Sequence, residues 1–105
     1  MNKPSAWELW YARVKHEDLE IYKDRPVLVI DAGDEFAIIA LIVTSTEKRD
    51  LWGEYDIIKW KSAGLKNAST VRCTKVLSLQ LGDFRRKIGD LQLEDILKIK
   101  EILQS

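Results

Sequence analysis

Two apolar runs separated by a short polar stretch dominate the middle of the sequence. They span residues 26–30 and 36–43, with turn-forming residues at 31–35. Runs of strand length, rich in β-branched residues and joined by a turn, predict a β-hairpin whose strands are buried on both faces. Pro26 fits this interpretation because proline is tolerated at the first position of a strand. Periodicity alone leaves a buried helix as the alternative.

The flanking segments show strand and helix patterns as well. Residues 8–14 are rich in aromatic side chains and predict a first strand, which a charged loop at 16–24 follows. Residues 55–58 predict a short strand, and 62–68 a loop or a single helical turn. Residues 93–103 place Ile96, Ile99 and Leu103 on one helical face, with acidic residues in the first turn, which predicts an amphipathic helix.

Residues 69–79 alternate as a half-buried strand does. Val71, Cys73 and Leu77 are expected on one side, and Thr70, Arg72 and Thr74 on the other. Together the segments predict a mainly β protein with a C-terminal α-helix. The length of 105 residues suits one domain, spanning residues 1–105.

Composition narrows the class of protein. Hydrophobic residues make up 46% and charged residues 32%, the balance of a folded globular chain. Lys plus Arg equals Asp plus Glu at 17 each, so any nucleic-acid-binding face must come from local clustering of basic residues. A lone cysteine, the absence of a signal-peptide pattern and the lack of any apolar run of about 20 residues predict a cytoplasmic protein outside the membrane.

Several chemistries find no support in the sequence. With one His and one Cys, a zinc site of nitrogen and sulfur ligands within the chain is not expected, and we predict no metal and no cofactor. A hydrolase triad would have to use His16, which lies in the charged loop without a nucleophile-elbow motif. The five glycines are scattered singly, so neither a phosphate-binding loop nor a dinucleotide fingerprint is present.

The remaining candidates are Arg25, just before an apolar strand, the cluster Thr44-Ser45-Thr46, just after the next strand, and Arg72. If the two apolar runs pair as a hairpin, Arg25 comes near Thr44. An arginine beside hydroxyls is a plausible phosphate receptor, because guanidinium binds phosphate bidentately and stays charged. Alternatively, Arg25 pairs with Asp24 or Asp31, and the hydroxyls satisfy turn backbone.

Four motifs in order resemble the MazF/PemK family of toxins. The strings are RPVLVI at 25–30, IVTST at 42–46, AGLKNASTV at 63–71 and KIGDL at 87–91. The resemblance implies a compact SH3-like barrel of the MazF/PemK/CcdB type and a homodimer held in check by a cognate antitoxin. It also implies metal-independent cleavage of single-stranded RNA by 2′-hydroxyl attack, giving 2′,3′-cyclic phosphate and 5′-hydroxyl ends.

The resemblance also implies roles for individual residues. Arg25 would stabilise the transition-state phosphate, Thr44 or Ser45 would contact the scissile phosphate, and Arg72 would match the arginine of the PemK branch. Where that branch has an aspartate two residues after the arginine, this chain has Thr74, which cannot act as a general base near neutral pH and is a candidate RNA-binding residue.

Other candidates surround these positions. His16 is a candidate catalytic or RNA-binding residue, but it lies nine residues before Arg25, whereas the PemK histidine lies six before the RP arginine, so the two are not in equivalent positions. Lys48 and Arg49 are candidate contacts to the RNA backbone, or simply a solvated loop tip. Trp52, Tyr55 and Trp60 either stack on bases or, as we favour, pack the barrel and the dimer. A non-catalytic RNA- or protein-binding relative and a gyrase-directed toxin are the alternative functions.

Overall fold

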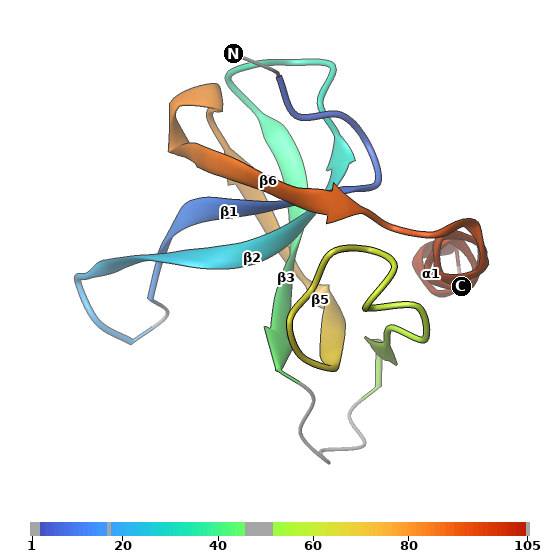
Figure 1. The fold of residues 1–105 in the computed structure, drawn as a ribbon. Helices are drawn as coiled ribbons and strands as arrows, with labels where there is room; N and C mark the ends of the chain where they lie inside the picture. The colour runs from blue at the N-terminus through green and yellow to red at the C-terminus, as the bar shows by residue number, and fades with distance from the viewer. Residues whose placement is uncertain (1–2, 17, 46–51, 105) are drawn as a thin grey trace.

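The computed structural model describes residues 3–16, 18–45 and 52–104, and these form one antiparallel sheet with a C-terminal helix (Figure 1). The sheet has 6 strands in the order β4-β5-β3-β2-β1-β6. The strands are β1 (Glu8–Lys15), β2 (Tyr22–Asp31), β3 (Ile38–Ser45), β4 (Glu54–Asp56), β5 (Ser69–Leu79) and β6 (Phe84–Asp90). A 3₁₀ turn, η1 (Leu81–Asp83), precedes β6, and the helix is α1 (Leu93–Gln104). The predicted mainly β architecture with a C-terminal helix is therefore confirmed.

The two apolar runs form the central hairpin, β2 and β3, with Val27 opposite Ile42 and Leu28 opposite Leu41. Both strands are buried on both faces, because each face of the curled sheet packs against its own cluster of apolar side chains. Leu28, Leu41, Val43 and Ile99 belong to the cluster that α1 covers. Val27, Val29, Ala40 and Trp10 belong to the cluster inside the curl. The strand interpretation, not the buried helix, is correct.

A bulge in β5 changes which side chains share a face. Leu41 pairs with Val76, but its neighbour Ile42 pairs with Arg72, so β5 carries extra residues between these two pairs. An odd number of inserted residues reverses the alternation of side chains, and a bulge also bends the strand. As a result Val71 and Cys73 pack in the cluster under α1, whereas Leu77 packs against the other cluster. The prediction that Leu77 shares a side with Val71 and Cys73 was wrong for this reason.

Several boundaries differ from the predictions. β2 begins at Tyr22 rather than Pro26, so part of the expected charged loop is strand and forms an arm with β1 at the left of Figure 1. β3 begins at Ile38, because Phe36 lies in the preceding turn and is 79% exposed. β6 was not predicted as a strand: only Phe84 in it is buried, and its charged residues hide the alternation.

Asp95 ties the helix to the segment before β5. Its carboxylate accepts hydrogen bonds from the Tyr55 hydroxyl at 2.5 Å and from the backbone N–H groups of Ile58 and Lys59, each at 2.9 Å. Tyr55 and Trp60 pack against the cluster under α1, as favoured, whereas Trp52 is 75% exposed. In the part of the chain described, no helix has the length and apolarity to cross a bilayer.

Candidate active site

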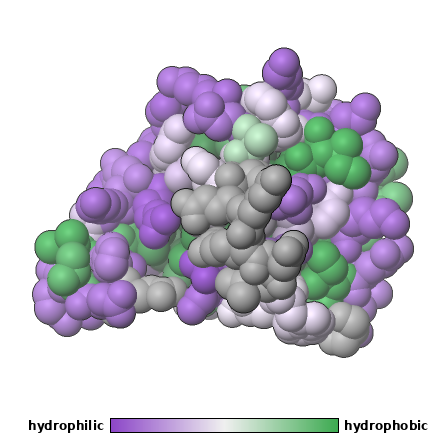
Figure 2. Space-filling view, turned by 90° about the horizontal axis from the view of Figure 1, so that it is seen from below, coloured by the Kyte–Doolittle hydropathy of each residue, from purple (hydrophilic) through white to green (hydrophobic). Residues whose placement is uncertain are grey.

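A pocket of about 490 Å³ lies where β3 ends and β5 begins. Residues from several distant segments line it: Tyr11, Arg25, Pro26, Val43, Thr44, Ser45, Leu65, Lys66, Asn67, Ser69 and Arg72. The pocket therefore brings together four of the residues singled out in the sequence, namely Arg25, Thr44, Ser45 and Arg72. Figure 2 views the molecule from this end, where most of the visible surface is hydrophilic.

Strand pairing explains why Arg25 and Thr44 share the pocket. The last β2–β3 pair before the strands separate is Val27 with Ile42, and the same register continued by two residues sets Arg25 opposite Thr44. On its other side, Arg25 lies opposite Ala12 of β1. The hairpin geometry expected from the sequence is thus present.

The expected alternative partners of Arg25 are engaged elsewhere. Asp24 lies 3.4 Å from the Nε of Arg85, and Asp31 accepts a hydrogen bond from the backbone N–H of Gly33 at 2.9 Å. Within the described ranges, Arg25 forms no ion pair and no side-chain hydrogen bond, and it is half-buried. A half-buried guanidinium with no anionic neighbour favours an anion from outside the chain.

The hydroxyl of Thr44 is also left without a partner. Its Oγ1 is buried, and no group in the described part of the chain forms a hydrogen bond with it. An unsatisfied buried polar group costs about 1–3 kcal/mol, and such groups in folded proteins call for an explanation. Ser45, the next residue, is exposed at the pocket rim. A ligand oxygen in the pocket would satisfy Thr44.

Arg72 is held by a carboxylate that the sequence analysis did not single out. Its Nε lies 3.3 Å from Oε2 of Glu54, whose side chain is only 10% exposed, and the two residues are paired across β4 and β5. The angle is not that of a hydrogen bond, so this Nε–H has no acceptor among the described groups. Glu54 fixes the position of Arg72 and partly offsets its charge.

The opposite wall is a loop fixed by close backbone contact. Leu65, Lys66 and Asn67 line the pocket, and Gly64 just before them has φ +97°. A Cβ on Gly64 would lie 2.5 Å from the carbonyl oxygen of Ile88, and one on Gly89 would lie 1.9 Å from that of Ala63. Only glycine allows this loop to pack so closely on β6.

Other predicted site residues lie elsewhere. Thr74 lines a separate hollow of about 140 Å³ together with Trp52 and Ile102. His16 follows the Lys15–Tyr22 pair of the arm, which is three pairs from Ala12–Arg25, a separation of about 10 Å along the strand. Its Nδ1 accepts a hydrogen bond from the backbone N–H of Asp18 at 3.1 Å. Thr46, Lys48 and Arg49 lie outside the described residues.

The family model for PemK-like, MazF-like toxins of type II toxin-antitoxin systems matches residues 5–105. No curated protein matches the sequence significantly.

Three solved structures illustrate the likeness of fold. A MazE-MazF structure from Deinococcus radiodurans has a TM-score of 0.76 at 19% identity, over 98% of this chain and 94% of that one. An endoribonuclease in complex with its cognate antitoxin, from a mycobacterial species, gives 0.75 at 15%, over 95% and 90%. The Mycobacterium tuberculosis toxin MazF-mt6 gives 0.67 at 22%, over 91% of each chain. At these identities the matches show a shared fold.

Proposed function

This chain belongs to the family of PemK-like, MazF-like toxins of type II toxin-antitoxin systems, and from that premise we propose that it is an endoribonuclease that cleaves single-stranded RNA without a metal ion. The observation that carries the proposal is the unpaired Arg25 guanidinium opposite the unpartnered Thr44 hydroxyl in one open pocket. Both groups lack a partner in the described part of the chain, and a phosphate supplies one for each.

The proposed reaction is an internal transesterification. The 2′-hydroxyl loses its proton and attacks the adjacent phosphorus, the bond from phosphorus to the 5′-oxygen breaks, and that oxygen takes up a proton. The products carry a 2′,3′-cyclic phosphate and a 5′-hydroxyl. Negative charge grows on the phosphoryl oxygens in the transition state, so pre-positioned donors lower the barrier.

The pocket residues divide this work. Arg25 binds the scissile phosphate through its guanidinium, which remains charged at every working pH. Thr44, with Ser45 beside it, donates a hydrogen bond to a phosphoryl oxygen or orients the 2′-hydroxyl. Arg72, positioned by Glu54, adds a second positive charge at the far side of the pocket. Thr74 replaces the PemK aspartate and lines another hollow, which supports a mechanism without the PemK pair of arginine and aspartate.

Partners follow from the family in the same way. One similar structure is described as an endoribonuclease with its cognate antitoxin, and another as MazE-MazF. We infer that this chain likewise binds a cognate antitoxin, works as a homodimer and acts in the cytoplasm.

The test is cleavage of a long single-stranded RNA by purified, antitoxin-free protein in EDTA, with chemical mapping of the product ends. Discrete cuts with 2′,3′-cyclic phosphate ends are expected. Arg25→Ala should lower the cleavage rate about 10²–10³-fold, the usual cost of losing a transition-state donor. Arg13→Ala is the matched control, because it removes the same charge from an exposed side chain that stacks on Tyr22 and does not line the pocket.

Either failure has a clear meaning. Full activity in a folded Arg25→Ala variant would reject the site. Intact RNA from folded wild-type protein would reject the enzyme and favour the second candidate, a non-catalytic RNA-binding relative, which the absence of the PemK-type aspartate favours.

A further inference from the structure

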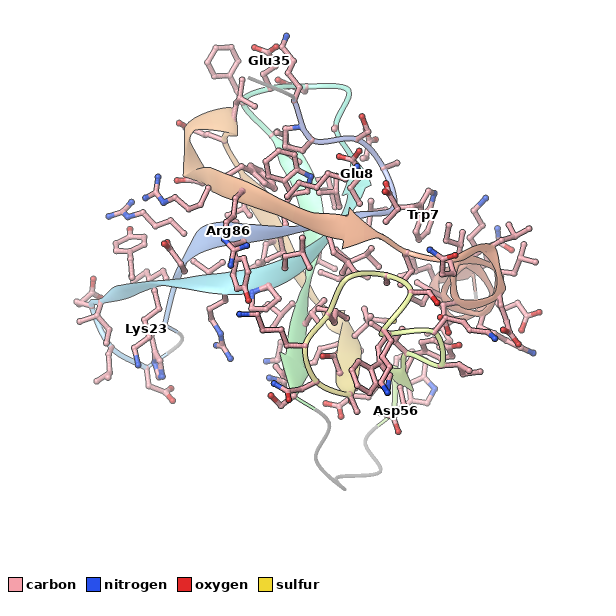
Figure 3. The ribbon with its side chains drawn as sticks, in the orientation of Figure 1. Trp7, Glu8, Lys23, Glu35, Asp56 and Arg86 are labelled. Atoms are coloured by element: carbon pink, nitrogen blue, oxygen red, sulfur yellow. The ribbon has the colours of Figure 1, made fainter. Side chains whose placement is uncertain are left out.

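Tyr11 and Arg86 form a pair next to the pocket that the proposed cleavage does not use. They face each other across β1 and β6 as a register pair, and the Arg86 guanidinium carbon lies 4.5 Å from the centre of the Tyr11 ring. Figure 3 labels Arg86 on β6, beside β1. A cation over an aromatic ring is held in place while its outward N–H groups remain available.

A small hollow of about 60 Å³, distinct from the one at Thr74, lies at this pair. Tyr11, Leu65 and Lys66 line both this hollow and the larger pocket, whereas Arg86 and Ile88 line the smaller one alone. One water needs about 10–15 Å³ of such space, so the hollow admits a group of several atoms, such as a phosphate. Because these three residues line both spaces, the smaller hollow adjoins the larger pocket, and an extended ligand can occupy both.

Part of the wall of the smaller hollow is closely packed backbone. Gly64 lines it, and the close contact between this glycine and Ile88 fixes the loop against β6. Tyr11 lies between β6 and β2, opposite Arg86 on one side and Pro26 on the other. The distance from Arg86 to the Arg25 end of the pocket is therefore set by three adjacent strands, at about 4.8 Å for each step.

The charge of this region also favours an anion. Arg86 and Lys66 are exposed, and neither forms an ion pair with any residue for which the structure gives a placement. Together with Arg25 they gather positive charge around Tyr11 in a chain of zero net charge. This is the local clustering of basic residues that a neutral protein needs in order to bind nucleic acid.

We propose that the smaller hollow is a phosphate subsite for a nucleotide that flanks the cleaved bond. Arg86 and Lys66 bind its phosphate, and the Tyr11 ring holds Arg86 and contacts the attached nucleoside. The subsite rests on the proposed function and deepens it, because it assigns the RNA a path from Arg25 across Tyr11 to β6. Arg86 acts in binding, not in the bond-breaking step.

The experiment compares wild type, Arg86→Ala and Arg13→Ala. Arg13→Ala is the matched control, because Arg13 also stacks on a tyrosine, Tyr22, but lines neither the larger pocket nor the smaller hollow. Cleavage kinetics on one single-stranded RNA give KM and kcat separately. Fluorescence anisotropy with a labelled single-stranded DNA of the same sequence, which lacks the attacking 2′-hydroxyl, gives affinity as a function of salt.

Arg86→Ala should raise KM about tenfold with kcat unchanged, as expected for the loss of one charge-assisted contact. The slope of log affinity against log salt should fall by about 0.7, the value for one phosphate contact on a single strand. Arg86→Lys should restore the slope but only part of the affinity, since lysine cannot stack on Tyr11 in the same way.

Two results would overturn the subsite. The first is a KM and salt slope for Arg86→Ala that equal those of Arg13→Ala. The second is a loss of kcat at saturating RNA, which would make Arg86 part of the chemistry instead. If the wild type binds RNA but does not cleave it, the proposed function fails, and the salt slope of the same variants still decides the subsite.

Discussion

Replacing Asp95 should release the helix from the segment that leads to the pocket. Asp95 is completely buried, and its two carboxylate oxygens accept hydrogen bonds from Tyr55 and Ile58 at one oxygen and from Lys59 at the other. Asn has nearly the same shape, so an Asp95→Asn variant changes the hydrogen bonding without opening a cavity. It is therefore a clean test of what this carboxylate contributes.

The expected cost follows from counting donors. If the Asn oxygen keeps Tyr55 and Ile58, its NH₂ group points at the Lys59 N–H, and two donors face each other 2.9 Å apart. Losing one charge-assisted hydrogen bond and adding this conflict should cost about 2 kcal/mol. Asp95→Ala removes all the acceptors and should cost roughly 3–5 kcal/mol, the range for breaking a buried charged interaction.

Urea unfolding measures both costs. Thermal unfolding gives another measure: at about 4–8 °C per kcal/mol in a domain near this size, Asp95→Asn should lower Tm by about 10 °C. Glu94→Gln is the control, because it removes the same charge from an exposed neighbour in the same turn. A change below about 0.5 kcal/mol in Asp95→Asn, equal to that of Glu94→Gln, would refute the reasoning.

A second readout is the ionisation of Tyr55. Burial raises the pKa of the Tyr55 hydroxyl, and the hydrogen bond to Asp95 raises this pKa further. Asp95→Asn removes the carboxylate charge while the burial and the charge of Glu94 remain, so the pKa of Tyr55 should fall and tyrosinate absorbance should appear at lower pH than in the wild type. An unchanged titration would mean that the bond to Asp95 is not made in solution.

The other predictions concern Gly89 and Cys73. Gly89→Ala puts a Cβ 1.9 Å from the Ala63 oxygen and should lower the free energy of unfolding in urea by about 3 kcal/mol. Gly82→Ala, which has no atom within 4 Å of its new Cβ, should cost far less. Equal costs would contradict the close contact. Burial raises the pKa of Cys73 from 9.0 to about 11. Iodoacetamide should therefore alkylate the folded protein near neutral pH about a hundredfold more slowly than the urea-unfolded chain. Comparable rates would contradict the burial. Because the unfolded chain loses this proton first, the free energy of unfolding should fall as pH rises from about 9 to about 11, and Cys73→Ala should reduce that fall.

The sequence determined the parts of this protein that local pattern controls. The apolar runs around residues 31–35 became the central hairpin β2–β3, the alternation over 69–79 became β5, and the 3.6-residue period became α1. In a hairpin of two nearly equal strands, the start of the first strand lies beside the end of the second. The sequence alone therefore predicted that Arg25 and Thr44 lie close together. In each case neighbouring residues carry the information.

Only the tertiary structure decided what depends on segments far apart in the chain. The bulge that places Leu77 and Val71 on different faces arises where β5 bends around the curled sheet, and no local pattern in β5 predicts it. β6 is a strand because β1 accepts it as a partner, although most of its residues are exposed and charged. Local periodicity carries no signal for pairings of this kind.

The same limit applies to the candidate site. Glu54 beside Arg72, and Arg86 over Tyr11, are cross-strand pairs whose members are 18 and 75 residues apart, as their numbers show. The loop wall at Lys66 depends on two glycines that meet only after folding. The sequence thus supplied the residues that meet at the hairpin ends, and the packing of the sheet supplied their neighbours, because side-chain proximity across a sheet is set by register and not by spacing along the chain.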